Sequence, residues 1–236
     1  PRQFARATAL FTAIFVTVVI FAVGVPASKG LPVVERPSQM RSDTLAILVT
    51  GDGGWRALDR DLAEALNARG VSVVGLIAPD YFARRKTANE SSEALHTLIE
   101  SYTQRWHRSR VILIGYSRGA GVLPFMVSRL PPKERSRISV VALLGLDRGI
   151  DFHYSPKVLL WAADDDLSVP VTPELHKIRD QNVLCVAGSD DKEAMCRSLD
   201  SAIAKTFFVP GGHHFGGNYV RIAARILQEA RVRPSI

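Results

Sequence analysis

The sequence lacks most features that mark specialised classes of protein. Only two of its 236 residues are cysteine, and no zinc-type spacing of cysteine and histidine is present. It has no internal repeat and no low-complexity tract, which excludes repeat arrays. Aromatic residues make up 8% and do not interleave with basic residues in a stripe, so we expect no direct contact with nucleic acid. The chain is 47% hydrophobic and 22% charged, which is typical of a single globular domain with one well-filled core.

The sequence has one long hydrophobic run, and it lies near the N-terminus. Arg2 and Arg6 precede an apolar run over residues 7–25, and Val25-Pro26-Ala27 supplies the small residues that a signal peptidase reads. We therefore predict a signal peptide over residues 1–27. An uncleaved inner-membrane anchor is the alternative, because the run is close to the ~20 residues that a membrane span needs.

Either interpretation delivers the rest of the chain to the outside of the cytoplasm. Residues 28–42 contain two prolines and are predicted to be a linker, followed by one domain over residues 43–236. The formal net charge of the whole chain is +7. A basic surface is compatible with docking on an anionic membrane.

Short apolar runs alternate with helix-compatible segments along this domain. The expected strands are residues 44–50, 71–77, 111–114, 138–146, 152–161, 183–187 and 206–209, and the expected helices are residues 57–69, 89–106, 120–130 and 219–230. Strands that alternate with helices of ten or more residues predict an α/β fold with a mostly parallel sheet and helices on both faces.

The most informative stretch is Val111-Ile112-Leu113-Ile114-Gly115-Tyr116-Ser117-Arg118-Gly119. A buried strand ends here in Gly-x-Ser-x-Gly, and helix-compatible sequence follows at once. This pattern predicts a sharp strand-to-helix turn with Ser117 exposed at its apex as a nucleophile. Gly115 and Gly119 would let the strand and the helix approach closely. An ordinary loop serine is the competing interpretation of the motif alone.

An acid and a histidine follow in the order that an α/β-hydrolase triad requires. Asp191 comes after the strand at 183–187, and His213 and His214 come after the strand at 206–209. Either histidine could be the general base, with His213 favoured, while Asp190 is the alternative to Asp191. A rival acidic run, residues 164–166, lies one strand too early.

No metal or cofactor is expected at this site. Neighbouring histidines rarely bind one ion, and no cysteine or carboxylate cluster completes a ligand set. An acyl-transfer site does need donors for a developing oxyanion. We expect these to be the backbone amide of Arg118 and that of Asp52 or Gly53, in a glycine-rich loop after the first strand. No Gly-Lys-Ser/Thr follows that loop, which argues against phosphate binding.

The two cysteines, Cys185 and Cys196, flank the loop that carries Asp191. In an exported protein such a pair predicts a disulfide. Closing so short a loop would stabilise the fold by roughly 2–3 kcal/mol on the chain-entropy model. The disulfide would also hold the acid in position against the histidine.

These motifs together resemble a known family, the bacterial virulence proteins VirJ and AcvB. The resemblance is carried by Gly51-Asp52-Gly53-Gly54-Trp55-Arg56, Asp80-Tyr81-Phe82, Arg85-Lys86-Thr87, Ile114-Gly115-Tyr116-Ser117, Val122-Leu123-Pro124-Phe125, the cysteine pair and residues 210–219. It implies a periplasmic protein with an α/β-hydrolase fold. AcvB-like members hydrolyse lysyl-phosphatidylglycerol, whereas VirJ-like members are associated with T-DNA transfer and type IV secretion.

The resemblance therefore favours a serine esterase acting on an aminoacylated membrane phospholipid. A binding protein that works with secretion-system proteins and a general carboxylesterase are the alternatives. The sequence departs from the family pattern at Arg118, where an aromatic residue is usual, and at Gly121, where Asp is common. A cation next to the nucleophile is expected to repel a cationic lysyl head group.

Overall fold

The computed structural model describes residues 30–154 and 168–232, and these form a three-layer α/β structure around one sheet. The sheet has the strand order β1-β3-β2-β4-β5-β8-β9. Its strands are β1 (Val33–Arg36), β2 (Thr44–Val49), β3 (Ser72–Leu76), β4 (Arg110–Tyr116), β5 (Ile138–Leu144), β8 (Val183–Gly188) and β9 (Lys205–Val209). All neighbours pair in parallel except β1, which runs antiparallel to β3. The strands β6 (Gly149–Ile150) and β7 (Val169–Pro170) pair separately.

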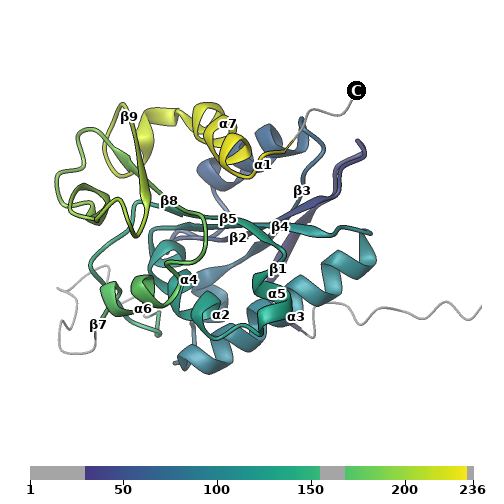
Figure 1. Ribbon diagram of the computed structural model, residues 1–236, viewed down its shortest axis with the longest axis horizontal. Helices are drawn as coiled ribbons and strands as arrows, with labels where there is room; N and C mark the ends of the chain where they lie inside the picture. Colours follow the sequence, from purple (N-terminus) through teal and green to yellow (C-terminus); the bar gives the residue numbers. More distant parts are fainter. Residues whose placement is uncertain (1–29, 155–167, 233–236) are drawn as a thin grey trace, which may run out of the picture.

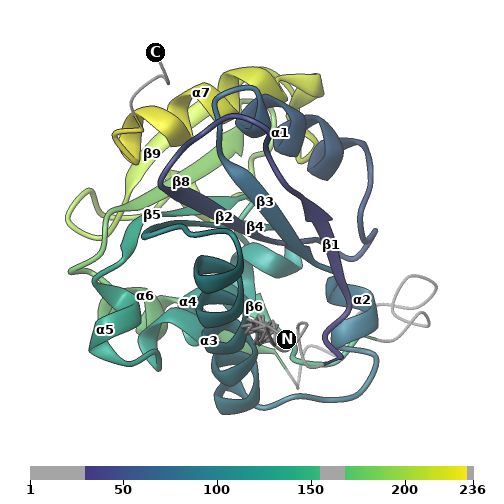
Figure 2. The ribbon, with the colours of Figure 1, turned by 90° about the vertical axis from the view of Figure 1, so that its right-hand side faces the viewer.

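Helices cover both faces of the sheet. On one face lie α1 (Ala57–Asn67) and α7 (Tyr219–Glu229), which Figure 1 shows above the strands. On the other face lie α2 (Ala78–Tyr81), α3 (Ala88–Arg105), α4 (Arg118–Ser128), α5 (Pro132–Arg135) and α6 (Thr172–Lys177) (Figures 1 and 2). Two buried apolar clusters result, one on each face. Strands covered on both sides must be apolar throughout, and every residue of β2 is buried.

The helical spacing of apolar residues explains why α1 packs where it does. Leu58, Leu62 and Leu66 are buried and belong to the same cluster as the buried residues of α7. Gly70 follows the helix with a φ of +81°, a backbone conformation that favours glycine and lets the chain turn into β3.

Most of the predicted elements are present, with boundaries shifted by one or two residues. The prediction that residues 28–42 form only a linker is wrong, because Val33–Arg36 forms β1 at the edge of the main sheet. Edge strands tolerate flanking prolines, since one side of their backbone needs no partner, so the prolines at 32 and 37 do not prevent pairing.

Three other expectations concern segments that the structure describes in part or not at all. The strand expected at 152–161 is not present at Phe152–Tyr154, and the remainder of it lies outside the described residues. The predicted signal peptide over residues 1–27 and the acidic run at 164–166 also lie outside them. Within the described ranges, no helix is long and apolar enough to cross a membrane.

Candidate active site

Ser117 occupies a strained turn between β4 and α4. Its φ of 51° and ψ of −113° are rarely adopted by a residue with a side chain. Gly115 and Gly119 make the turn possible, because a Cβ on Gly115 would collide with the carbonyl of Gly119 and a Cβ on Gly119 with that of Val49. The Ser117 amide donates to the Leu144 carbonyl at 2.9 Å, which anchors the turn to β5. This is the geometry of a nucleophile elbow.

His213 is paired with an acid from the neighbouring loop. Its Nδ1 lies 3.2 Å from Asp191 Oδ2, and the Asp191 side chain is only 12% exposed. A carboxylate accepts, so Nδ1 carries the proton and the Nε2 lone pair is left to act as a base. Asp190 points elsewhere, since its carboxylate accepts from Ser189 Oγ at 3.0 Å on the surface.

His214 has a different partner. Its Nδ1 lies 2.6 Å from the phenol oxygen of Tyr116. Burial raises the pKa of Tyr116, and the nearby Asp59 raises it further, so the phenol keeps its proton. The two adjacent imidazoles therefore have different partners at Nδ1, a carboxylate for His213 and a neutral phenol for His214.

One cavity of about 270 Å³ brings these groups together at the carboxyl ends of the strands. It is lined by Ser117, His213 and His214, together with Gly51, Asp52, Gly53, Gly54, Arg56, Ala57, Leu58, Asp59, Tyr116 and Tyr219. In an open parallel sheet, ligands bind in just this position. The sequence-predicted nucleophile, both histidines and the glycine-rich loop thus share one cavity.

The glycine-rich loop lies directly against the nucleophile. A Cβ built on Gly51 would stand 3.2 Å from Ser117 Cβ. Among the described residues, the amides of Asp52 and Gly53 donate to no other backbone group. The amide of Arg118 is the first of α4, where N–H groups have no acceptor within the helix. In the part of the chain that the structure describes, none of the three expected oxyanion donors bonds to a backbone carbonyl.

The Arg118 side chain follows the nucleophile in the sequence, but it is buried and does not line the cavity at Ser117. Its guanidinium is 8% exposed, is paired with the Asp52 carboxylate and donates to the Asp151 carbonyl at 2.5 Å. It also lies over the Tyr154 ring at 5.7 Å. The expected repulsion of a cationic head group stays a prediction, but the charge behind it is paired with Asp52, and Arg118 does not line the cavity.

A disulfide joins Cys185 and Cys196, with 5.5 Å between their Cα atoms. It closes the loop that carries Asp191, as the cysteine positions predicted. Arg197 braces the same loop by donating from Nε to the Asp191 carbonyl at 2.9 Å. The loop also contacts the histidine loop, since the Asp190 amide donates to the Gly211 carbonyl at 3.0 Å.

Sequence reasoning missed Asp147 and Asp59. Asp147 follows β5 at the same edge of the sheet, and burial of its carboxyl group raises its pKa, although the residue as a whole is exposed and the nearby His213 opposes the shift. The rule that located Asp191 at a strand end would also have found Asp147. Asp59 gave no such signal, because an acid in the first turn of a helix is common.

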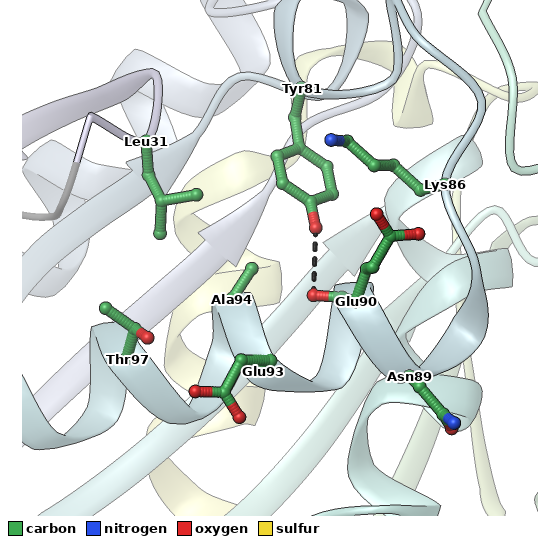
Figure 3. A pocket seen from close by; sticks show the side chains of 8 residues that line it. All are labelled: Leu31, Tyr81, Lys86, Asn89, Glu90, Glu93, Ala94 and Thr97. Atoms are coloured by element: carbon green, nitrogen blue, oxygen red, sulfur yellow. Dashed lines mark hydrogen bonds between the residues drawn. The ribbon is translucent and has the colours of Figure 1, made fainter.

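A second, larger opening of about 560 Å³ lies beside α3, away from the predicted site residues. Figure 3 shows the side chains that line it, which come from Leu31, the region around α2, and α3. Tyr81 donates to the Glu90 carbonyl at 3.1 Å, and Lys86 lies over the Tyr81 ring at 5.2 Å.

Within the described part of the chain, no group of three or more His, Cys, Asp or Glu side chains could hold a metal ion.

Solved structures with the same fold include Est1E from Butyrivibrio proteoclasticus bound to ferulic acid, with a TM-score of 0.57, 14% identity, and coverage of 84% of this chain and 93% of that one. MenH from S. aureus matches with a TM-score of 0.58, 12% identity, and coverage of 84% and 98%. An α/β serine hydrolase without a lid from Xanthomonas campestris matches with a TM-score of 0.53, 15% identity, and coverage of 84% and 87%. These likenesses show that the chain has the α/β-hydrolase fold.

The sequence itself has no significant match among curated proteins. Residues 43–234 match the family described as bacterial virulence protein (VirJ). That range spans the whole sheet from β2 onward, and it includes the serine turn, the disulfide loop and both histidines. The chain therefore belongs to the VirJ family of bacterial virulence proteins.

Proposed function

We propose that this protein is an exported serine esterase that cleaves the ester bond of an aminoacylated phospholipid such as lysyl-phosphatidylglycerol. The observation that carries the proposal is that Ser117, in its strained turn, shares one cavity with His213, whose Nδ1 is paired with Asp191. A nucleophile and a base in one cavity, with an acid bonded to the base, are the parts that acyl transfer needs.

In the first half-reaction, Ser117 Oγ attacks the carbonyl carbon of the ester while Nε2 of His213 takes its proton. Asp191 holds the imidazole in the required tautomer and stabilises the imidazolium. The carbonyl oxygen becomes an oxyanion, which accepts from the amide of Arg118 and from that of Asp52 or Gly53. Collapse breaks the bond to the lipid hydroxyl, which leaves with the proton from His213, and an aminoacyl ester remains on Ser117.

In the second half-reaction, water replaces the lipid. His213 takes a proton from the water, whose oxygen attacks the acyl carbon, and the same amides bind the second oxyanion. The bond to Ser117 Oγ then breaks, and the serine recovers its proton from His213. The products are the free amino acid and the phospholipid without its aminoacyl group.

Three features support the export and the substrate. The disulfide fits a compartment outside the cytoplasm, where thiols are oxidised. The chain is basic, and a Lys or Arg near an anionic membrane contributes up to about 1 kcal/mol to docking. The pairing of the buried Arg118 side chain with Asp52 offsets the positive charge that follows the nucleophile in the sequence.

A fluorophosphonate probe tests the chemistry, since it reacts with activated serines. We expect the folded protein to be labelled and Ser117→Ala to lose all labelling. Ser136→Ala is the matched control, because Ser136 is exposed and donates only to the Lys133 carbonyl. If the folded wild-type protein is not labelled, the esterase proposal fails and a binding protein that retains the hydrolase fold is favoured.

Membrane lipid profiles test the substrate. We expect the lysyl-phosphatidylglycerol pool to fall when active protein is supplied and to stay unchanged with Ser117→Ala. An unchanged pool together with normal probe labelling would favour a carboxylesterase with another ester substrate.

A further inference from the structure

Asp59 is a buried acid with an unsatisfied oxygen. It is the third residue of α1 and is 1% exposed. Its Oδ2 accepts from the Arg56 amide at 2.9 Å, the usual role of an acid at the start of a helix. Its Oδ1 is buried and has no hydrogen-bond partner. Buried carboxylate oxygens are normally paired, because an unpaired one costs free energy, so this oxygen requires a partner from elsewhere.

Asp59 lines the same cavity as Ser117. Its ionisable neighbours there are tyrosines, since Asp59 raises the pKa values of both Tyr116 and Tyr219. Arg56 also lines the cavity, but its Nε donates to the Gly53 carbonyl at 2.8 Å. In the described ranges, no cation forms an ion pair with Asp59.

The size of the cavity limits what can occupy it. Pockets for drug-sized ligands measure roughly 300–1,000 Å³, and this one measures about 270 Å³. It therefore suits a small acyl group, with the bulk of a phospholipid outside. An ammonium group supplies what the buried Oδ1 lacks, namely a positively charged donor.

We propose that Asp59 binds the ammonium group of the substrate's acyl part while the ester lies at Ser117. This inference rests on the proposed esterase function and deepens it, because it assigns the residue that selects a cationic acyl group over a neutral one of equal shape. Burial raises the pKa of Asp59 to about 6, which is consistent with an acid that loses its proton fully when an ammonium arrives.

Two pairs of fluorogenic methylumbelliferyl esters test this inference. One pair is 6-aminohexanoate and heptanoate, and the other is alaninate and isobutyrate; within each pair an ammonium replaces a methyl group. For the wild-type protein we expect a higher kcat/KM for the ammonium ester in at least one pair. Asp59→Asn should reduce that preference by about ten- to a hundredfold, the value of one hydrogen bond to a charged group.

Asn at position 59 retains an oxygen for the Arg56 amide, so the helix start should persist. Asp61→Asn is the matched control, because it removes the same charge from an exposed position of the same helix. It should leave the preference unchanged. Fluorophosphonate labelling of Asp59→Asn at the wild-type rate would show that the nucleophile is intact.

Two outcomes would overturn the inference while leaving the esterase in place. One is a wild-type protein that hydrolyses the esters without preferring either ammonium compound. The other is an Asp59→Asn variant that loses the charged and the neutral ester equally, which would mark a purely structural role. Failure of the proposed function is distinct from both, because then Ser117 would not be labelled and no ester would be hydrolysed.

Discussion

The cavity at Ser117 and the opening beside α3 differ in size and in chemistry. Size alone would favour the opening beside α3 as the functional site, whereas the chemistry of the lining residues favours the cavity at Ser117. The opening beside α3 has about twice the volume, and the Tyr81 hydroxyl in it already donates to the Glu90 carbonyl (Figure 3). The smaller cavity contains a strained serine, two histidines with different Nδ1 partners and an acid with an unpaired oxygen. Convergent groups that are held ready for a ligand, rather than volume, distinguish a reactive site.

The largest effect should come from removing the base. His213→Ala is expected to lower kcat for an activated ester by roughly 10⁴-fold or more, because the serine can no longer lose its proton to a positioned group. Glu93→Gln, in the opening beside α3, should change kcat by less than about threefold. Steady-state kinetics on methylumbelliferyl butyrate provide the measurement. A His213→Ala variant with wild-type kcat would contradict the assignment of the cavity at Ser117, rather than the opening beside α3, as the catalytic site.

The next largest effect on kcat should come from Asp191, and it should distinguish Asp191 from the adjacent Asp190. Asp191→Asn is expected to lower kcat by about 10³- to 10⁴-fold, since the imidazole loses the carboxylate that sets its tautomer. Asp190→Asn should have little effect, because the Asp190 carboxylate accepts from Ser189 Oγ on the surface and the substitution leaves the backbone unchanged. The same kinetic assay compares them. Equal losses in both variants would show that the loop, and not the Asp191 carboxylate, is what matters.

The pH dependence of stability should have opposite signs in the two cavities. The folded-state pKa of Asp59, about 6, lies above its ordinary value of 3.8, so the folded protein binds more protons between these pH values and loses stability as the pH rises. Asp59→Asn should therefore be the more stable protein above pH 6, by up to about 3 kcal/mol, with no difference below about pH 3.8.

Glu90 provides the opposite case. Bonds from the Thr87 amide and hydroxyl lower the pKa of Glu90, so its contribution to stability is present at neutral pH and is lost as the pH falls through its folded-state pKa. Glu90→Gln should thus be less stable than the wild type at neutral pH. Urea unfolding curves at several pH values measure both variants. Parallel pH profiles for the two would contradict the assignment of Asp59 as a strained acid.

The smallest effect should come from the disulfide. Replacing both Cys185 and Cys196 with Ser is expected to lower the free energy of unfolding by roughly 2–3 kcal/mol, as for the closure of a loop of this length. Activity should fall as well, because the Asp191 loop loses a restraint. Urea unfolding and ester kinetics measure the two effects. Lost stability with full activity would show that Arg197 and the backbone bonds to the histidine loop keep the Asp191 loop in place without the disulfide.

Periodicity was enough to predict the parallel strands of the main sheet and its long helices α1, α3, α4 and α7, but not the short helices α2, α5 and α6. The apolar strands, the helical spacing in α1 and the glycines around Ser117 each reflect one local rule, so neighbouring residues carry the whole signal. The strand Val33–Arg36 escaped prediction because it is short and flanked by prolines, and only its pairing with β3 identifies it. The predicted signal peptide remains a prediction.

The choice between adjacent residues could not be made from the sequence. His213 and His214 have the same side chain and the same loop, and their roles differ only because Asp191 lies beside one and Tyr116 beside the other. Arg118 illustrates the same limit, since its neighbour in sequence is the nucleophile, whereas its partner in space is Asp52. Tertiary contacts between loops decide such cases, and local patterns do not contain them.

The backbones of the acid loop and the histidine loop are joined to one another. Ser189 and Asp190 donate their amides to the carbonyls of Val209 and Gly211, and Gly188 leaves no room for a Cβ where the loops cross. Asp191 and His213 consequently belong to two loops that are hydrogen-bonded to each other and are expected to move together. The backbone bonds therefore keep Asp191 and His213 paired with one another independently of their position relative to Ser117. Insertions in either loop should be tolerated only on the side that faces away from the crossing.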